Sequence, residues 1–75
     1  MRDDIRRVAA HEVDVCGEEL LHNAVVELLH ERVVNYYTFA DELPFTEWLG
    51  GRIEIRRDGE GTMNMKAYRS GRLLK

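Results

Sequence analysis

The sequence predicts an α+β domain in which two to three helices pack against a C-terminal antiparallel β-hairpin, with a third short strand as an alternative. Two periodicities support this fold class. Apolar residues recur at helical spacing through most of residues 4–31, whereas residues 52–68 alternate apolar and polar side chains around a glycine-rich turn. A chain of 75 residues forms one domain, which we place at 1–68, followed by a flexible basic tail at 69–75.

The first predicted helices lie in the N-terminal half of the chain. Asp3 and Asp4, both typical of an N-cap, stand at the start of a helix predicted over 4–10. Residues 12–16 fit a helix and a half-buried strand equally well, because they also alternate. Residues 18–31 predict an amphipathic helix, with leucine, alanine and valine on one half of the helical wheel. Past Leu29 the apolar side chains move to the opposite side, so this helix either bends near Glu31 or is covered on both sides.

The C-terminal part predicts a short helix and a hairpin. Proline is tolerated in the first turn of a helix, so we expect a helix over 44–49 that ends at two glycines. Residues 52–57 and 62–68 then alternate as strands on either side of an Asp-Gly turn. The expected core face of the hairpin consists of Ile53, Ile55, Met63, Met65 and Ala67.

Charge is unevenly distributed along the chain. Residues 1–51 carry four cations and eleven carboxylates, whereas residues 52–75 carry seven cations and three carboxylates. The net charge of −3 is therefore the sum of an acidic N-terminal part and a basic C-terminal part. Such an uneven charge distribution indicates possible binding partners more than it indicates the fold. The sequence contains no catalytic or cofactor-binding motif, no secretory signal and no apolar run long enough for a membrane helix. We expect a cytoplasmic protein that is not an enzyme and uses no cofactor.

These features predict a small regulator or inhibitor that docks through an acidic helical face on a larger protein or nucleoprotein complex, either basic or nucleic-acid-handling. An inhibitor encoded by a phage or mobile element, of the anti-CRISPR type, fits the small size and the lack of motifs. A homodimer is also expected, because a core this small often needs a partner chain. The predicted partner-binding residues are Glu19, Glu27, Glu31, Tyr36, Tyr37, Asp41 and Glu42.

The basic hairpin supports an alternative function in nucleic-acid binding. A β-ribbon can enter a DNA major groove, where arginine can pair with guanine. The residues that would do so are Arg52, Arg56, Arg57 and Lys66. The carboxylates of the first 51 residues oppose this interpretation, because they repel phosphates.

A second alternative is a metal-dependent activity through two Glu-x-x-His motifs, formed by Glu19 with His22 and Glu27 with His30. On one helix the two motifs would lie about 12 Å apart along the axis, too far to share one metal ion. A charged helix face is therefore the simpler interpretation. Zinc ligation by the three histidines (with His11) and Cys16 is disfavoured by spacings of five, six and eight residues.

Aromatic residues are concentrated in the middle of the chain. Five of the six fall between residues 36 and 48, namely Tyr36, Tyr37, Phe39, Phe45 and Trp48. Tyrosine and tryptophan often dominate interface energetics, so this group could form a contact patch. We expect Phe39, Phe45 and Trp48 in the core beneath the hairpin, and at least one of the two adjacent tyrosines at a surface.

Overall fold

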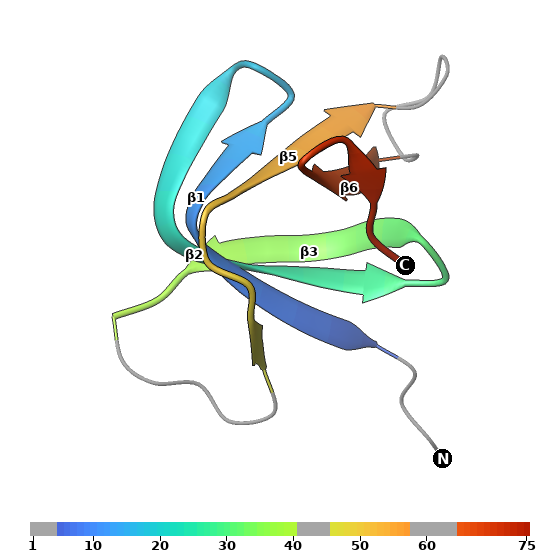
Figure 1. The fold of residues 1–75 in the computed structure, drawn as a ribbon, viewed down its shortest axis with the longest axis horizontal. Coiled ribbons are helices and arrows are strands. Elements are labelled where there is room, and N and C mark those ends of the chain that lie inside the picture. The colour runs from blue at the N-terminus through green and yellow to red at the C-terminus, as the bar shows by residue number, and fades with distance from the viewer. Residues whose placement is uncertain (1–4, 41–45, 58–64) are drawn as a thin grey trace.

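The protein is described by a computed structural model that covers residues 5–40, 46–57 and 65–75. Within these residues there is no helix, and seven strands form one mixed sheet (Figure 1). The strands are β1 Arg6–Val15, β2 Glu19–Leu29, β3 Arg32–Thr38, β4 Glu47–Trp48, β5 Arg52–Arg57, β6 Met65–Arg69 and β7 Arg72–Leu73. The predicted α+β fold is therefore wrong, because the described chain is all-β.

β1 is the central strand of the sheet, whose order is β3-β2-β1-β5-β6-β7. One edge of β1 pairs antiparallel with β2 from Arg6↔Leu28 to Val15↔Glu19. The other edge pairs in parallel with β4 near its start and with β5 near its end. β3 and β6 also lie close to each other, so the sheet curls into a partly open barrel (Figure 1).

A bend crosses the middle of the sheet. In β2, Asn23 adopts a φ of +54°, and Gly50 and Gly51 between β4 and β5 adopt +68° and +61°. The central strand β1 contacts this glycine pair directly. The backbone N–H of Glu12 donates to the Gly51 carbonyl at 3.1 Å. The core-facing residues of β1 have even numbers before the bend and odd numbers after it. One long strand can therefore line two walls of the barrel.

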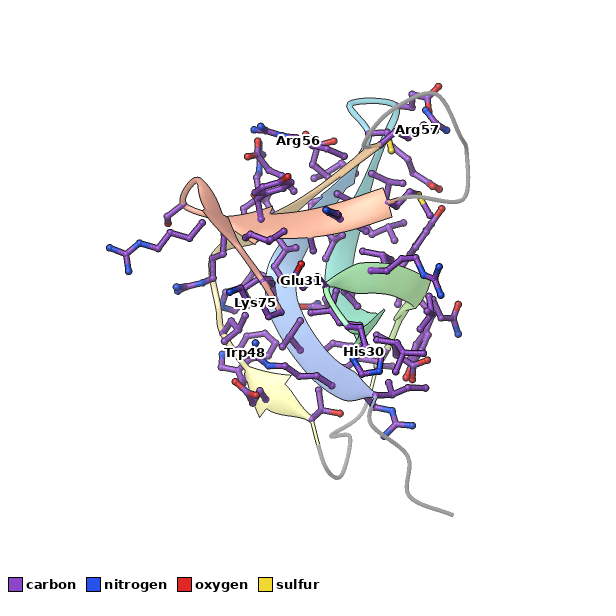
Figure 2. All side chains as sticks on the ribbon, turned by 90° about the vertical axis from the view of Figure 1, so that its right-hand side faces the viewer. His30, Glu31, Trp48, Arg56, Arg57 and Lys75 are labelled. Atoms are coloured by element: carbon purple, nitrogen blue, oxygen red, sulfur yellow. The ribbon has the colours of Figure 1, made fainter. Side chains whose placement is uncertain are left out.

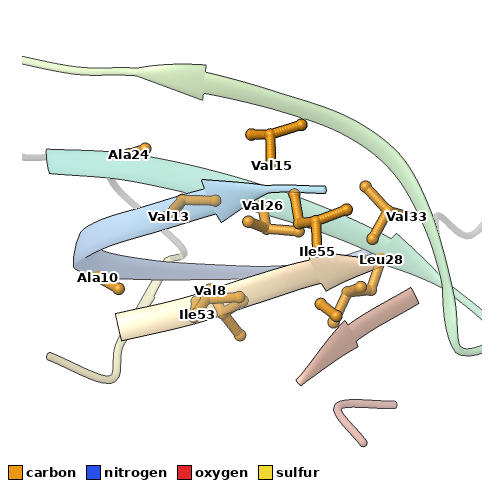
Figure 3. Close-up of a cluster of buried hydrophobic side chains, with 11 residues drawn as sticks. Val8, Ala10, Val13, Val15, Ala24, Val26, Leu28, Val33, Ile53 and Ile55 are labelled. Carbon is orange, nitrogen blue, oxygen red and sulfur yellow. The ribbon is translucent and has the colours of Figure 1, made fainter. Parts of the chain in front are cut away.

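The core consists of aliphatic side chains of small to medium size. Buried together are Val8, Ala10, Val13, Val15, Ala24, Val26, Leu28, Val33, Ile53, Ile55 and Ala67 (Figure 3). Among the described residues, no aromatic side chain is fully buried and no polar residue is buried. Valine and isoleucine are stiff at χ1 and pack well on a pleated surface, which favours strands over helices.

The predicted hairpin is confirmed in its two strands, which pair antiparallel from Glu54↔Tyr68 to Arg57↔Met65. Of its expected core face, Ile53, Ile55 and Ala67 are buried and Met65 is half-buried against the core. Met63 and the predicted turn lie outside the described residues. The alternation along these strands identifies them because only one face of the hairpin is apolar.

The helices predicted over 4–10 and 18–31 are wrong, because β1 includes residues 6–10 and β2 spans residues 19–29. In β2 the consecutive residues Ala24, Val25 and Val26 are all 0% exposed, so this strand is covered on both faces. A strand buried on both sides loses its alternation, and its apolar run then resembles a helical stripe. The strand interpretation of 12–16 is correct as far as Val15.

The change of periodicity near Glu31 marks a tight turn instead of a helix bend. His30 and Glu31 join the paired residues Leu29 and Arg32, and both have positive φ, at +50° and +71°. Two positive φ angles in a two-residue connection are the signature of a type I′ hairpin turn.

The remaining predicted segments also adopt extended structure where they are described. The helix predicted over 44–49 is replaced at Glu47–Trp48 by β4, and its first two residues lie outside the described residues. Residues 72–73 of the expected tail form β7, and the Leu74 N–H donates to the Ala67 carbonyl at 2.8 Å. No helix in the described part of the chain is long and apolar enough to cross a membrane.

Candidate binding face on the outer side of the sheet

Strand pairing gathers four side chains into one row on the outer face of the sheet. Tyr37 is paired with Val25, Val25 with Ala9, and Ala9 with Trp48. Directly paired residues project from the same side of a sheet, so this row crosses β3, β2, β1 and β4. Ala9 is 2% exposed and Val25 is 0% exposed, although both point away from the core cluster.

Trp48 is the most exposed large apolar side chain of the described residues, at 52% (Figure 2). Its ring lies 4.7 Å from the His11 ring and 6.3 Å from the Phe39 ring, measured between centroids. The interplanar angles are 90° and 89°, so both neighbours meet the indole at right angles. These edge-to-face contacts stabilise the indole in one orientation. We call this group of Trp48, His11 and Phe39 the aromatic corner.

The bend in the sheet positions the aromatic corner. The Phe39 N–H donates to the carbonyl of Asn23 at 2.9 Å, which fixes the chain just after β3. The Leu49 N–H donates to the Ala9 carbonyl at 2.8 Å, which fixes the chain just after Trp48. Leu49 packs against the core, so its neighbour Trp48 points to the outer side.

A polar network borders the row on one side. The Arg7 Nε donates to Glu27 Oε2 at 2.8 Å, and the Tyr37 hydroxyl donates to the same oxygen at 3.1 Å. The Glu27 side chain is only 13% exposed, so both donors are needed to satisfy it. Burial, followed by the interactions with Glu27, raises the pKa of Tyr37, and the nearby Arg7 partly opposes that rise.

A second ion pair holds β4 against the start of β1. Arg6 Nε and Nη2 donate to the two carboxylate oxygens of Glu47 at 2.9 and 3.0 Å, and Nη1 donates to the Lys75 carbonyl at 2.9 Å. The hydrogen bond from Arg6 lowers the pKa of Glu47, and the same bond raises the pKa of Arg6. β4 contributes only two residues to the sheet, and this bidentate pair adds a side-chain attachment to its backbone pairing with β1.

The charge division along the sequence does not persist in space. Three ion pairs join cations of the last third of the chain to carboxylates of the first half, and Figure 2 labels one of them, Lys75 with Glu31. They are Arg52–Glu12 at 3.2 Å, Arg57–Glu18 at 3.2 Å and Lys75–Glu31 at 3.9 Å. The structure therefore interleaves opposite charges where the sequence separates them.

Among the described residues there is no helix, so those of the predicted partner-binding residues that are described do not lie on an acidic helical face. Glu19 is exposed at the start of β2, Glu31 lies in the β2–β3 turn, and Tyr36 packs partly against the core. Glu27 and Tyr37 are the two that contact each other, on the outer face. Asp41 and Glu42 lie outside the described residues.

The residues proposed to contact nucleic acid lie on β5 and β6. Arg56 pairs with Glu54 at 3.0 Å and lies over the Tyr68 ring, 5.2 Å from its centroid. Arg56 is also the register partner of Lys66. Arg52, Arg56 and Arg57 each hold a carboxylate of the protein, which reduces the positive potential that phosphates would meet.

The metal hypothesis places two Glu-x-x-His motifs on one helix, but the structure places their residues in β2 and in the β2–β3 turn. Glu19 and His22 lie in a strand, where residues three apart project to opposite faces. Glu27 holds Arg7, and its motif partner His30 lies in the β2–β3 turn. No group of three or more histidine, cysteine or carboxylate side chains able to hold a metal occurs in the described ranges.

A hollow of about 340 Å³ lies beside the β1–β2 turn, and its lining includes Asp14, Cys16, Glu54, Arg56 and Arg57. Asp14 accepts a hydrogen bond from the Gly17 N–H at 2.9 Å, Glu54 accepts one from Arg56, and Arg57 pairs with Glu18. These groups hold the turn against β5, where the Cys16 N–H also donates to the Ile55 carbonyl at 2.7 Å. The charged groups named in this lining therefore all have partners within the protein.

Sequence reasoning missed the aromatic corner. Trp48 was expected in the core and is instead exposed, Phe39 is half-buried on the outer side, and Phe45 lies outside the described residues. The sequence pattern also gives no sign that His11 lies beside an aromatic ring. A usable signal was the alternation of Trp48 with Leu49, which places one of the two outside as soon as the segment is read as a strand.

No protein-family model matches the chain, and neither a curated protein nor a solved structure shows significant similarity to it. Its function is therefore inferred from the surface itself.

Proposed function

We propose that the protein is a non-enzymatic binding module that regulates or inhibits a larger protein by docking its outer face on that partner, with Trp48 as the central contact. The observation that supports this function is a tryptophan 52% exposed on a sheet face whose underlying residues are almost completely buried. Tryptophan and tyrosine are enriched among the residues that contribute most to binding energy. We place this regulator in the cytoplasm, of a host cell if the protein is encoded by a phage.

The face is preorganised for binding. Trp48 lies between two perpendicular rings, and Tyr37 is held by its hydrogen bond to Glu27. Side chains already fixed in the free protein lose little conformational entropy when a partner covers them. A rigid aromatic surface can therefore give useful affinity from a small contact area.

A protein partner is favoured over nucleic acid because of the charges. The three arginines of β5 each pair with a carboxylate, and the net charge of the chain is −3. Nucleic-acid binding requires cations that are available to phosphates. The nucleic-acid alternative therefore has less support than protein binding.

The test compares Trp48→Ala with Leu20→Ala as baits in the native host lysate. Leu20 is a matched control because it is 43% exposed and lies in β2 on the other side of the bend. A true partner should be retained by the wild type and by Leu20→Ala, and should bind Trp48→Ala at least about 30-fold more weakly, as expected for a hot spot. Equal retention by both variants, with both folded by circular dichroism, would contradict the proposal.

A further inference from the structure

We propose that the aromatic corner is a receptor for an arginine side chain presented by a basic segment of the partner. This inference rests on the proposed function and specifies the chemistry of its central contact. Three observations support it: the geometry of the rings, the charge of the adjoining sequence and the engagement of nearby cations.

The ring geometry suits a flat cation. The indole of Trp48 remains half exposed although two rings meet it at right angles, so part of its surface is left open between fixed aromatic neighbours. The face of an aromatic ring carries negative potential, and tryptophan gives the strongest cation–π interaction. The guanidinium group of arginine is planar and weakly hydrated, and it stacks on such faces better than the ammonium of lysine.

The sequence that adjoins the corner is acidic. From Phe39 to Leu49 the chain contains Asp41, Glu42 and Glu47 and no lysine or arginine, and of these three carboxylates Glu47 is already paired with Arg6. Asp41 and Glu42 lie outside the described residues and are not assigned to the site. In the sequence these two carboxylates follow Phe39 by two and three residues, so the segment that leaves Phe39 carries negative charge, which attracts a basic segment and repels phosphate.

The cations near the corner already have partners within the protein. Arg6 holds Glu47 and the Lys75 carbonyl. Arg7 holds Glu27, and Arg69 Nη2 donates to the carbonyl of Leu49 at 2.8 Å. Arg6 and Arg7 are thus each paired with a carboxylate, whereas Arg69 is held by a backbone carbonyl and keeps its charge at the edge of the face.

The single tryptophan of the chain provides a direct reporter, because its indole N–H gives one signal in a ¹H–¹⁵N NMR spectrum. The probes are the peptide acetyl-Gly-Arg-Gly-amide and the same peptide with citrulline, which has the shape of arginine without its charge. We expect a saturable shift of the Trp48 signal with the arginine peptide. The citrulline peptide should bind about 2- to 30-fold more weakly, the range that corresponds to measured cation–π energies.

Two variants localise the effect. Phe39→Leu keeps an apolar side chain but removes one ring, and should weaken arginine binding about 2- to 10-fold while Trp48 still reports it. Leu20→Ala lies beyond the bend and should bind as the wild type does. A dispersed amide spectrum of each variant shows that it is folded.

Three results would overturn the inference: equal binding of the two peptides, an absence of saturable shifts, or a thymidine oligonucleotide that saturates the same signal where the arginine peptide does not. Equal binding of arginine and citrulline together with Trp48-dependent capture of a partner would reject the arginine receptor and leave the docking function intact. Loss of both effects would reject the face as an interface.

Discussion

Trp48 and Ala9 are direct partners in a parallel ladder, yet 52% of one residue is exposed and only 2% of the other. The small residue lies in the central strand, and the large one lies in the two-residue strand beside it. The same arrangement leaves much of the indole in contact with solvent. The pairing of β4 with the central strand therefore places Trp48 on the surface that we propose for binding.

The first prediction compares the loss of stability caused by a substitution in the core with that caused by a substitution on the candidate binding face. Leu28→Ala removes a side chain that is 1% exposed in the aliphatic core, and should lower the free energy of unfolding by about 2–5 kcal/mol. Trp48→Ala removes a half-exposed ring and should cost about 1–2 kcal/mol, from lost ring contacts and partial uncovering of the row beneath. Urea denaturation of both variants gives the comparison. A larger loss for Trp48→Ala would mean that the indole serves mainly as core.

The second prediction concerns the β2–β3 turn. His30 and Glu31 both adopt left-handed backbone conformations, which cost non-glycine residues about 1–2 kcal/mol each. Asn-Gly is the preferred sequence for a type I′ turn. The double variant His30→Asn/Glu31→Gly should therefore raise the free energy of unfolding by about 1–2 kcal/mol, although it removes the 3.9 Å ion pair to Lys75. A lower melting temperature than the wild type would contradict this expectation.

The C-terminal hairpin could be predicted because its signal is local. In β5 and β6 the apolar residues alternate along each strand, and the partner strand follows within a few residues. β2 offers no such signal, because Val25 faces the outer row while Ala24 and Val26 face the core. Its leucines, glutamates and alanine favour helices in isolation, but long-range pairing on both edges outweighs that weak preference.

The candidate binding face could not be predicted for a related reason. The parallel pairing of β1 with β4 joins residues that are far apart in the sequence, such as Ala9 and Trp48. No periodicity within one segment reports such a contact. The exposure of Trp48 also contradicts the general tendency of tryptophan to be highly buried, which is the reason for regarding it as functional.

The third prediction tests how the bend supports Trp48. Gly50 has a φ of +68°, and a Cβ added there would lie 3.7 Å from Trp48 Nε1. Gly50→Ala should therefore lower the free energy of unfolding by about 1–2 kcal/mol through backbone strain, and change the fluorescence of Trp48. Gly71→Ala is the control, because Gly71 has a φ of +80° and open space around it. The control should lose similar stability with unchanged fluorescence, and a fluorescence change in both variants would argue against a local effect.

The fourth prediction uses the ion pair between Arg6 and Glu47, which attaches β4 and so positions Trp48. The folded protein holds the pKa of Glu47 below its ordinary value, through the hydrogen bond from Arg6. A lowered pKa means that the pair contributes stability above the ordinary glutamate pKa of about 4.3, and that this contribution is lost as the pH falls through the lower folded value. Both side chains are partly exposed, at 37% and 54%, so the contribution should be only about 0.5 kcal/mol.

Glu47→Gln should accordingly be less stable than the wild type at pH 7, and the two proteins should converge as the medium is acidified below the folded pKa. Urea denaturation of both proteins from pH 7 down to pH 3 measures the difference. Added salt at pH 7 should reduce the gap, because exposed charges are screened. A constant difference across the whole range would show that Glu47 acts through packing or a neutral hydrogen bond. The attachment of β4 would then not depend on the charge of Glu47.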